Sequence, residues 1–218
     1  TQEGIRGNEE FPDATHNATL PFTRFIAGAA DYTICYYRQD FGRLNADKDS
    51  YGVPRSKSIQ TTPAHQLALA AVYYSPLQYM YWYDKPSDSQ DEPELKFFDD
   101  VYTTWDDTKV LQGEVGEFIT IARRKGEEWF IGSITNNEKR VLSVSLDFLP
   151  EGKNYIAEIY TDGDKSVKTR TKVRVSTYPC EQQDEIKLLF ESIRGGAVRL
   201  VPDDGNIKSV KNYKQQRL

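Results

Sequence analysis

Val141-Leu142-Ser143-Val144-Ser145-Leu146 is the stretch of this sequence that decides the fold. Successive side chains of a β-strand point to opposite faces, so the alternation places Leu142, Val144 and Leu146 on one face and the two serines on the other. A strand of this kind belongs in a sheet that is buried on one side and solvated on the other. The stretch therefore predicts one strand of a two-layer β-sandwich.

Comparable runs lie on both sides of this stretch, separated by turn signals such as Lys125-Gly126 and Asn136-Asn137. They cover residues 118–122, 129–134, 155–160, 167–175, 186–190 and 197–201. About seven short strands at close intervals are typical of an antiparallel β-sandwich. We predict this domain over residues 109–202, followed by a polar tail over residues 203–218.

The first half of the chain has a different pattern. A helix is predicted to begin at Thr62 and Pro63, because threonine is a favoured N-cap and proline suits the first helical position. Apolar residues continue at helical spacing from Leu67 to Tyr74, and Pro76 ends the pattern. A second, shorter helix is predicted over residues 94–101.

The stretch from Asp31 to Gln60 has little periodicity and is long for a plain connection, which is typical of an active-site or surface loop. We interpret residues 1–108 as the C-terminal end of a (β/α)8 catalytic barrel and not as a complete fold. The predicted fold class is therefore α+β overall, with the end of a barrel followed by an antiparallel β-sandwich.

Composition limits the classes of partner. The 218 residues include 28 Lys and Arg against 33 Asp and Glu, giving a net charge of -5. No stretch concentrates Lys and Arg on an amphipathic element, so we expect no nucleic acid partner. The longest apolar run, near Leu67 to Val72, is far shorter than the roughly 20 residues of a membrane-spanning helix, so we expect no membrane partner. We also expect no signal peptide in this chain.

The opening segment Glu3-Gly4-Ile5-Arg6-Gly7-Asn8-Glu9 gathers ionisable residues around two glycines. Glycoside cleavage needs one carboxyl group that donates a proton to the leaving oxygen and a second that activates water or attacks carbon. A calcium ion needs hard oxygen ligands, which a carboxylate such as Glu3 supplies. The simpler alternative is a solvated turn in which Glu3 pairs with Arg6, and the spacing alone leaves both open.

Further segments match a known family in one order along the chain. They are His16-Asn17-Ala18-Thr19-Leu20-Pro21-Phe22-Thr23-Arg24, Asp31-Tyr32-Thr33, Thr61-Thr62-Pro63-Ala64-His65-Gln66-Leu67-Ala68-Leu69, Ser75-Pro76-Leu77-Gln78, and Trp105-Asp106-Asp107-Thr108 with Gly113-Glu114. With the opening segment they resemble the C-terminal third of glycoside hydrolase family 97, over about residues 1–160. The sequence departs from the family at Ile34-Cys35-Tyr36, where the family more often turns through Pro-Gly.

The resemblance implies a fold, an activity and a location. Members of the family combine an N-terminal β-supersandwich, a (β/α)8 catalytic barrel and a C-terminal β-sandwich, and they release sugars from α-glucosides or α-galactosides. The expected partners are therefore an α-linked oligosaccharide or glycoside substrate and the N-terminal remainder of the enzyme, in the same or a companion chain. The resemblance also implies a periplasmic location.

The resemblance assigns roles to individual residues as well. Glu9 is the implied general acid, with Glu10 as the alternative, and Glu3 is the implied ligand of a calcium cofactor. His16 and Arg24 are candidate contacts to sugar hydroxyls, although a histidine in a polar loop is as often simply hydrogen-bonded. The family's base or nucleophile lies upstream, so the resemblance does not decide between inversion and retention.

Two classes of function stay open from the sequence. One is calcium-assisted hydrolysis of α-glycosidic bonds by a larger glycoside hydrolase to which this chain contributes. The other is a non-catalytic carbohydrate-binding or structural module. The particular α-linked sugar is not predicted, because selectivity depends on pocket walls that lie mostly outside these residues.

Overall fold

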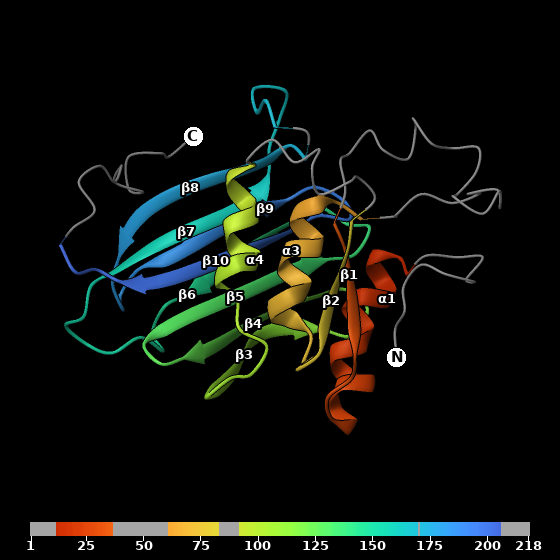
Figure 1. Cartoon of the computed structure of the whole chain (residues 1–218), viewed down its shortest axis with the longest axis horizontal. Helices are drawn as coiled ribbons and strands as arrows, with labels where there is room; N and C mark the ends of the chain where they lie inside the picture. The colour runs from red at the N-terminus through yellow and green to blue at the C-terminus, as the bar shows by residue number, and fades with distance from the viewer. Residues whose placement is uncertain (1–11, 37–60, 83–91, 170, 206–218) are drawn as a thin grey trace.

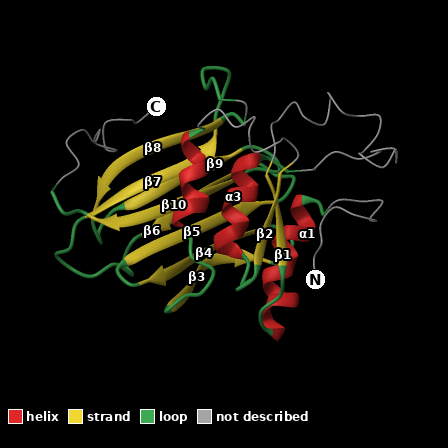
Figure 2. Cartoon of the chain, viewed as in Figure 1, coloured by secondary structure: helices red, strands yellow, loops and turns green. Residues whose placement is uncertain are grey.

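The computed structural model of the chain describes residues 12–36, 61–82, 92–169 and 171–205. Antiparallel strands dominate this part of the chain, and its helices are short (Figure 1, Figure 2). The elements are α1 (Ala14–Thr19), η1 (Leu20–Phe22), η2 (Arg24–Ala27), β1 (Tyr32–Tyr36), α3 (Pro63–Val72), β2 (Gln78–Trp82), η4 (Pro93–Leu95), α4 (Lys96–Asp100), β3 (Asp107–Glu114), β4 (Phe118–Lys125), β5 (Glu128–Thr135), β6 (Arg140–Ser145), β7 (Tyr155–Asp162), β8 (Val173–Cys180), β9 (Glu185–Phe190) and β10 (Gly195–Pro202).

The predicted β-sandwich is confirmed. Its larger sheet is antiparallel, in the order β3-β4-β5-β10-β7-β8, and its smaller sheet is the antiparallel pair β6-β9. Leu142 and Val144 of β6 are buried in the core between the sheets, whereas Val141 is exposed, as the alternation predicts. The apolar face of this strand therefore forms part of the core.

Strand β5 is buried on both faces. Trp129 and Ile131 point into the interior of the sandwich, whereas Phe130 and Ile134 belong to a second core on the helix side of the larger sheet. A strand covered on both faces carries a nearly continuous apolar run, which explains why β5 lacks the alternation of β6.

Helix α3 begins where the sequence predicts and ends earlier. The Thr62 hydroxyl accepts a hydrogen bond from the His65 backbone N–H at 3.3 Å, and Pro63 occupies the first turn. The helix ends at Val72 and not near Tyr74, because Tyr73 is extended. The Arg123 side chain donates to the Ala71 and Val72 carbonyl oxygens, which satisfies acceptors that the end of a helix leaves open.

Two glycines allow α3 to lie directly on the larger sheet. A Cβ atom at Gly132 would lie 2.4 Å from the Ala68 carbonyl oxygen, and one at Gly195 would lie 2.8 Å from the Cα atom of His65. All ten residues of α3 are buried as a result. Figure 1 shows α3 and α4 crossing the same face of this sheet, with α1 and the β1-β2 pair to one side.

The barrel part of the prediction is only partly met. Strands β1 and β2 pair in parallel, from Tyr32 opposite Gln78 to Tyr36 opposite Trp82, and α3 lies between them in the chain. A closed (β/α)8 barrel needs eight parallel strands, and the described residues contain only this parallel pair. The domain boundary near residue 108 stays a prediction, and of the predicted polar tail only residues 203–205 are described.

Two strands differ from the prediction. The run at residues 167–175 is mostly a loop: Gly163 N–H donates to the Lys172 carbonyl at 2.6 Å, and β8 begins only at Val173. Strand β3 was not among the predicted runs, because as an edge strand it carries mainly polar or charged residues. The predicted second helix over residues 94–101 is confirmed as η4 and α4.

Candidate functional site

The glutamates of the opening segment lie outside the described residues. This applies to Glu3, Glu9 and Glu10, whose roles therefore stay predictions. The two predicted sugar contacts, His16 and Arg24, lie in the described elements α1 and η2. No hydrogen bond joins them to each other.

His16 lies in the first turn of α1 and is exposed. Its backbone N–H donates to the Asp13 carboxylate at 2.7 Å, so Asp13 is the N-cap of the helix. None of the described residues forms a hydrogen bond with its imidazole ring. Its contact with a sugar stays a prediction.

Arg24 holds the turn that leads into β1. Its guanidinium donates to the Gly28 carbonyl at 3.3 Å and to the Ala29 carbonyl at 3.2 Å. Gly28 has a φ of 119°, a conformation that favours glycine, so the turn depends on both residues. Arg24 thus has a structural task that the sequence did not indicate.

A buried polar chain joins α1, α3 and the β9-β10 turn. His65 Nδ1 lies 3.1 Å from the Ile193 carbonyl oxygen, and His65 Nε2 lies 3.1 Å from Asn17 Nδ2. The Tyr73 hydroxyl donates to Asn17 Oδ1 at 3.0 Å. Asn17, His65 and Tyr73 are each at most 2% exposed. Water therefore cannot take the place of these hydrogen-bond partners unless a cavity opens.

The partners fix the protonation of His65. A carbonyl oxygen only accepts, so Nδ1 carries the proton, and Nε2 then accepts from the Asn17 amide. Burial lowers the pKa of His65 to about 4, although the carbonyls of Arg194 and Ile193 oppose that effect. The ring is therefore neutral at physiological pH, and a proton on Nε2 would break the bond to Asn17.

Asp162 joins the start of α3 to the larger sheet. Its carboxylate accepts from the Thr62 hydroxyl at 2.7 Å and from the Ala64 backbone N–H at 3.4 Å. Burial raises the pKa of this carboxyl to about 6, against the opposing effect of the hydrogen bond from Thr62. Asp162 ends β7, so this contact and the His65 contact both tie α3 to strand ends of the sandwich.

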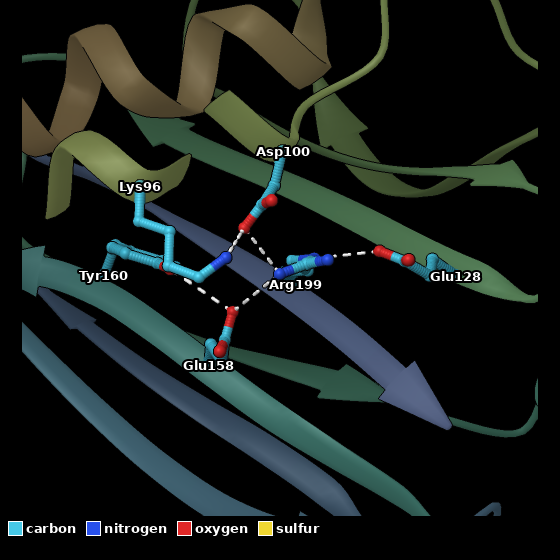
Figure 3. A network of polar contacts seen from close by, with 6 residues as sticks. All are labelled: Lys96, Asp100, Glu128, Glu158, Tyr160 and Arg199. Atoms are coloured by element: carbon cyan, nitrogen blue, oxygen red, sulfur yellow. Dashed lines mark hydrogen bonds and ion pairs between the residues drawn. The ribbon is translucent and has the colours of Figure 1, made fainter. Parts of the chain in front are cut away.

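The largest ion-pair network in the described part of the chain surrounds Arg199, near the middle of β10 (Figure 3). Its Nε donates to Glu128 at 2.8 Å, and its Nη1 donates to Asp100 at 2.6 Å and to Glu158 at 3.4 Å. The Arg199 side chain is only 13% exposed, so these are not freely solvated surface pairs. Lys96 adds a second cation by its contact with Asp100.

This network fastens α4 to the larger sheet. Asp100 is the last residue of α4, whereas Glu128, Glu158 and Arg199 come from the neighbouring strands β5, β7 and β10. The Arg199 guanidinium also lies 5.9 Å from the centre of the Phe130 ring. Every charge in the network has a partner of opposite sign, so its geometry is that of a structural clamp.

Metal ligands are not clustered in the described part of the chain. Residues 12–36, 61–82, 92–169 and 171–205 contain no group of three or more His, Cys, Asp or Glu side chains that could hold a metal ion. Glu3, the implied calcium ligand, lies outside these ranges. None of the helices within them is long and apolar enough to cross a membrane.

Comparison with known proteins identifies the family. Residues 104–201 match a family model described as glycosyl-hydrolase 97 C-terminal, oligomerisation. The retaining alpha-galactosidase of Bacteroides thetaiotaomicron is 31% identical over 207 residues, which cover 91% of this chain. The chain belongs to glycoside hydrolase family 97. The family membership predicted from the short motifs is thus confirmed, and this chain corresponds to the C-terminal part of the family's enzymes.

Further proteins are similar to this chain in sequence or in fold. A probable retaining alpha-galactosidase of Streptomyces bingchenggensis is 32% identical over 176 residues, 79% of this chain. A family 97 enzyme from Pseudoalteromonas sp. strain K8, solved with acarbose, superposes with a TM-score of 0.71 at 31% identity, over 88% of this chain. A beta-arabinopyranosidase shares the fold, with a TM-score of 0.63 at 22% identity and 85% coverage.

The chain spans only part of these relatives. It covers 30% of the Bacteroides enzyme, 25% of the Streptomyces protein, 29% of the Pseudoalteromonas structure and 27% of the arabinopyranosidase.

The motif that contains His65 carried part of the family resemblance, yet its residue types gave no sign of the contact with Asn17. Arg199 gave a weak signal, as a single charge within the apolar run 197–201.

Proposed function

We propose that this chain is the C-terminal part of an enzyme that hydrolyses α-glycosidic bonds, with Glu9 as the general acid. The observation that supports the proposal most is the 31% identity to a retaining alpha-galactosidase over 91% of the chain. The relatives point to two substrates, since the curated ones are named for α-galactosides and the solved Pseudoalteromonas enzyme binds acarbose and panose. The proposed substrate is therefore an α-galactoside or an α-glucoside.

In this proposal β1 and β2 are the last strands of a (β/α)8 barrel. The parallel pairing and the intervening helix α3 support this role, because parallel strands joined through a helix are the repeating unit of such barrels. The remaining strands and the opposing carboxylate come from the N-terminal remainder. His16 and Arg24 contact sugar hydroxyls, and the complete enzyme is periplasmic.

The acid is tested by substrates that differ in leaving group. In the enzyme that comprises this chain and its N-terminal remainder, Glu9→Gln should slow cleavage of a galactosyl or glucosyl disaccharide by roughly 10²- to 10⁴-fold. The kcat/KM for a 2,4-dinitrophenyl α-glycoside should be affected far less, because kcat/KM reports the first irreversible step, in which this leaving group departs without a proton. Glu10→Gln is the matched control and should cleave both substrates at nearly the parental rate.

The outcomes separate the alternatives. Loss of disaccharide cleavage in Glu10→Gln alone would transfer the acid role to Glu10. Parental rates in both variants would refute the assignment of the acid to this segment.

Calcium is the proposed cofactor, with Glu3 as one ligand, since a carboxylate oxygen is a donor that calcium favours. Chelation should abolish hydrolysis, and added calcium should restore it. Glu3→Gln should raise the calcium concentration that gives half-maximal activity by about tenfold or more, whereas Glu10→Gln should leave it unchanged. Activity that persists after exhaustive chelation would rule out the cofactor.

We further propose that the sandwich joins copies of the enzyme. The match of residues 104–201 to a model described by oligomerisation supports this role. This role agrees with the structural-module hypothesis from the sequence, and it is compatible with catalysis by the complete enzyme.

A further inference from the structure

One face of the parallel pair β1-β2 is covered by α3. Tyr32 of β1 is 5% exposed and belongs to the core that contains α3. Its partner in the pair is Gln78 of β2, whose Nε2 donates to the Ala70 carbonyl oxygen of α3 at 3.1 Å. Both side chains therefore point toward α3, which lies beside the pair in Figure 1.

The opposite face carries Thr33 and Tyr79. These two residues directly follow Tyr32 and Gln78 and are paired with each other, and successive side chains of a strand point to opposite faces. Tyr79 is 57% exposed, and Leu77, which leads into β2, is 49% exposed. A large aromatic side chain is thus left in water on this face of the pair.

Such exposure is unusual for parallel strands. Antiparallel sheets tolerate solvent on one face, whereas parallel sheets occur almost only with both faces covered. A sheet of two strands is also too small to be stable without such packing. The face of Thr33 and Tyr79 therefore calls for an apolar cover that the described part of the chain does not supply.

We propose that the face of Thr33 and Tyr79 docks onto the N-terminal remainder of the enzyme, with the Tyr79 ring packed in an apolar layer of the barrel interior. The inference rests on the proposed function, in which β1 and β2 are strands of that barrel. The size of the relatives favours this occupant, because the chain covers only 29% of the Pseudoalteromonas structure and 30% of the Bacteroides enzyme. Most of each relative is thus available to cover the face.

The position of Tyr79 along β2 favours an interior contact over stacking on a sugar. Active sites of (β/α)8 barrels lie at the carboxyl ends of the strands, and packed layers of side chains fill the barrel below them. Tyr79 is the second residue of β2, and Trp82 is the last. At about 3.3 Å per residue, Tyr79 lies roughly 10 Å before the carboxyl end of the strand.

Hydroxyl-radical oxidation, followed by mass spectrometry, can compare Tyr79 in this chain alone and in the complete enzyme. Docking should slow oxidation of Tyr79 by about fivefold or more, because most of its ring leaves water. Val115 is the control, since it is 60% exposed in the β3-β4 turn, and it should be oxidised at the same rate in both proteins. Protection of Tyr79 that appears when this chain alone is concentrated would make a second copy the occupant and overturn the proposal.

Substitution of Tyr79 tests the same surface by affinity. Tyr79→Asp should leave the urea unfolding of this chain unchanged, because the residue is exposed in it. It should weaken binding of the separately produced N-terminal remainder by about tenfold or more, measured by calorimetry. Tyr79→Phe and Val115→Asp should both bind like the parent. If the remainder does not fold by itself, the oxidation rate of Tyr79 in the complete enzyme decides.

The proposal is overturned by equal oxidation of Tyr79 in both proteins, or by parental binding in Tyr79→Asp. Hydrolysis of an α-galactoside or α-glucoside by the same complete enzyme separates this failure from failure of the proposed function. Hydrolysis with an exposed Tyr79 would remove only the docking surface. A protected Tyr79 without hydrolysis would keep the docking surface and refute the proposed activity.

Discussion

At the scale of the residue, His65 makes the stability of the fold depend on pH. Its pKa is about 4 in the folded chain, because of burial, and about 6.5 in the unfolded chain. Between these values the unfolded chain binds a proton that the folded chain does not. The free energy of unfolding therefore falls as the pH falls, by about 1.4 kcal/mol per unit and about 3 kcal/mol in all. The full contribution is present above pH 6.5.

Substitution of His65 isolates this contribution. The difference in unfolding free energy between the parent chain and His65→Gln should increase by about 3 kcal/mol from pH 4 to pH 7, measured by urea denaturation. Asp162 acts in the opposite sense, because its raised pKa lowers stability as the pH rises toward 6. It is present in both proteins and cancels in the difference. A difference that does not vary with pH would contradict the neutral buried ring.

At the scale of the element, α4 depends on the sheet beneath it. Five residues are too few for a helix to be stable alone, and Arg199 supplies the ionic link between its last residue and the sheet. Arg199→Met would leave Asp100, Glu128 and Glu158 without their common cation. We expect a loss of about 3–5 kcal/mol in unfolding free energy, by urea denaturation.

An exposed pair provides the control for this prediction. Arg174 lies 3.3 Å from Asp164, with side chains 45% and 72% exposed. Arg174→Met should cost at most about 1 kcal/mol, because water screens such pairs. Equal losses in the two variants would show that the Arg199 network behaves as an ordinary surface ion pair.

Some helices and strands could be predicted from the sequence and others could not. Strand β6 alternates cleanly because one of its faces is buried, and α3 starts at Thr62 and Pro63 because local capping decides it. The end of α3 could not be predicted, since it depends on Arg123 from a distant strand. The run at residues 167–175 alternates like a strand, but the hydrogen bond from the Gly163 N–H to the Lys172 carbonyl closes a loop, and β8 begins only at Val173.

At the scale of the whole molecule, the motifs predicted the family, and no pattern predicted how the two halves are joined. Glu3 and Glu9 follow from a local motif, whereas the contacts of His65 and Arg199 join residues up to 129 positions apart. The His65 contacts need α3 to lie against Gly132 and Gly195, whereas the contact of Arg199 with Asp100 needs α4 to lie on the larger sheet. The side chains that link the two halves therefore cannot be predicted from the spacing of residues in the sequence.

The proposed association of sandwiches can be tested on the smaller sheet. Val141 of β6 lies opposite Leu189 of β9, and the two are 62% and 51% exposed on the outer face, within the region that matches the oligomerisation model. Burying such side chains contributes about 1.5–3 kcal/mol each. Aspartate at both positions should therefore weaken self-association by about tenfold or more, measured by sedimentation velocity.

Val115→Asp is the control, since Val115 is 60% exposed in the β3-β4 turn, and it should not change the association. Unchanged sedimentation of the double variant would move the interface to another surface of the sandwich.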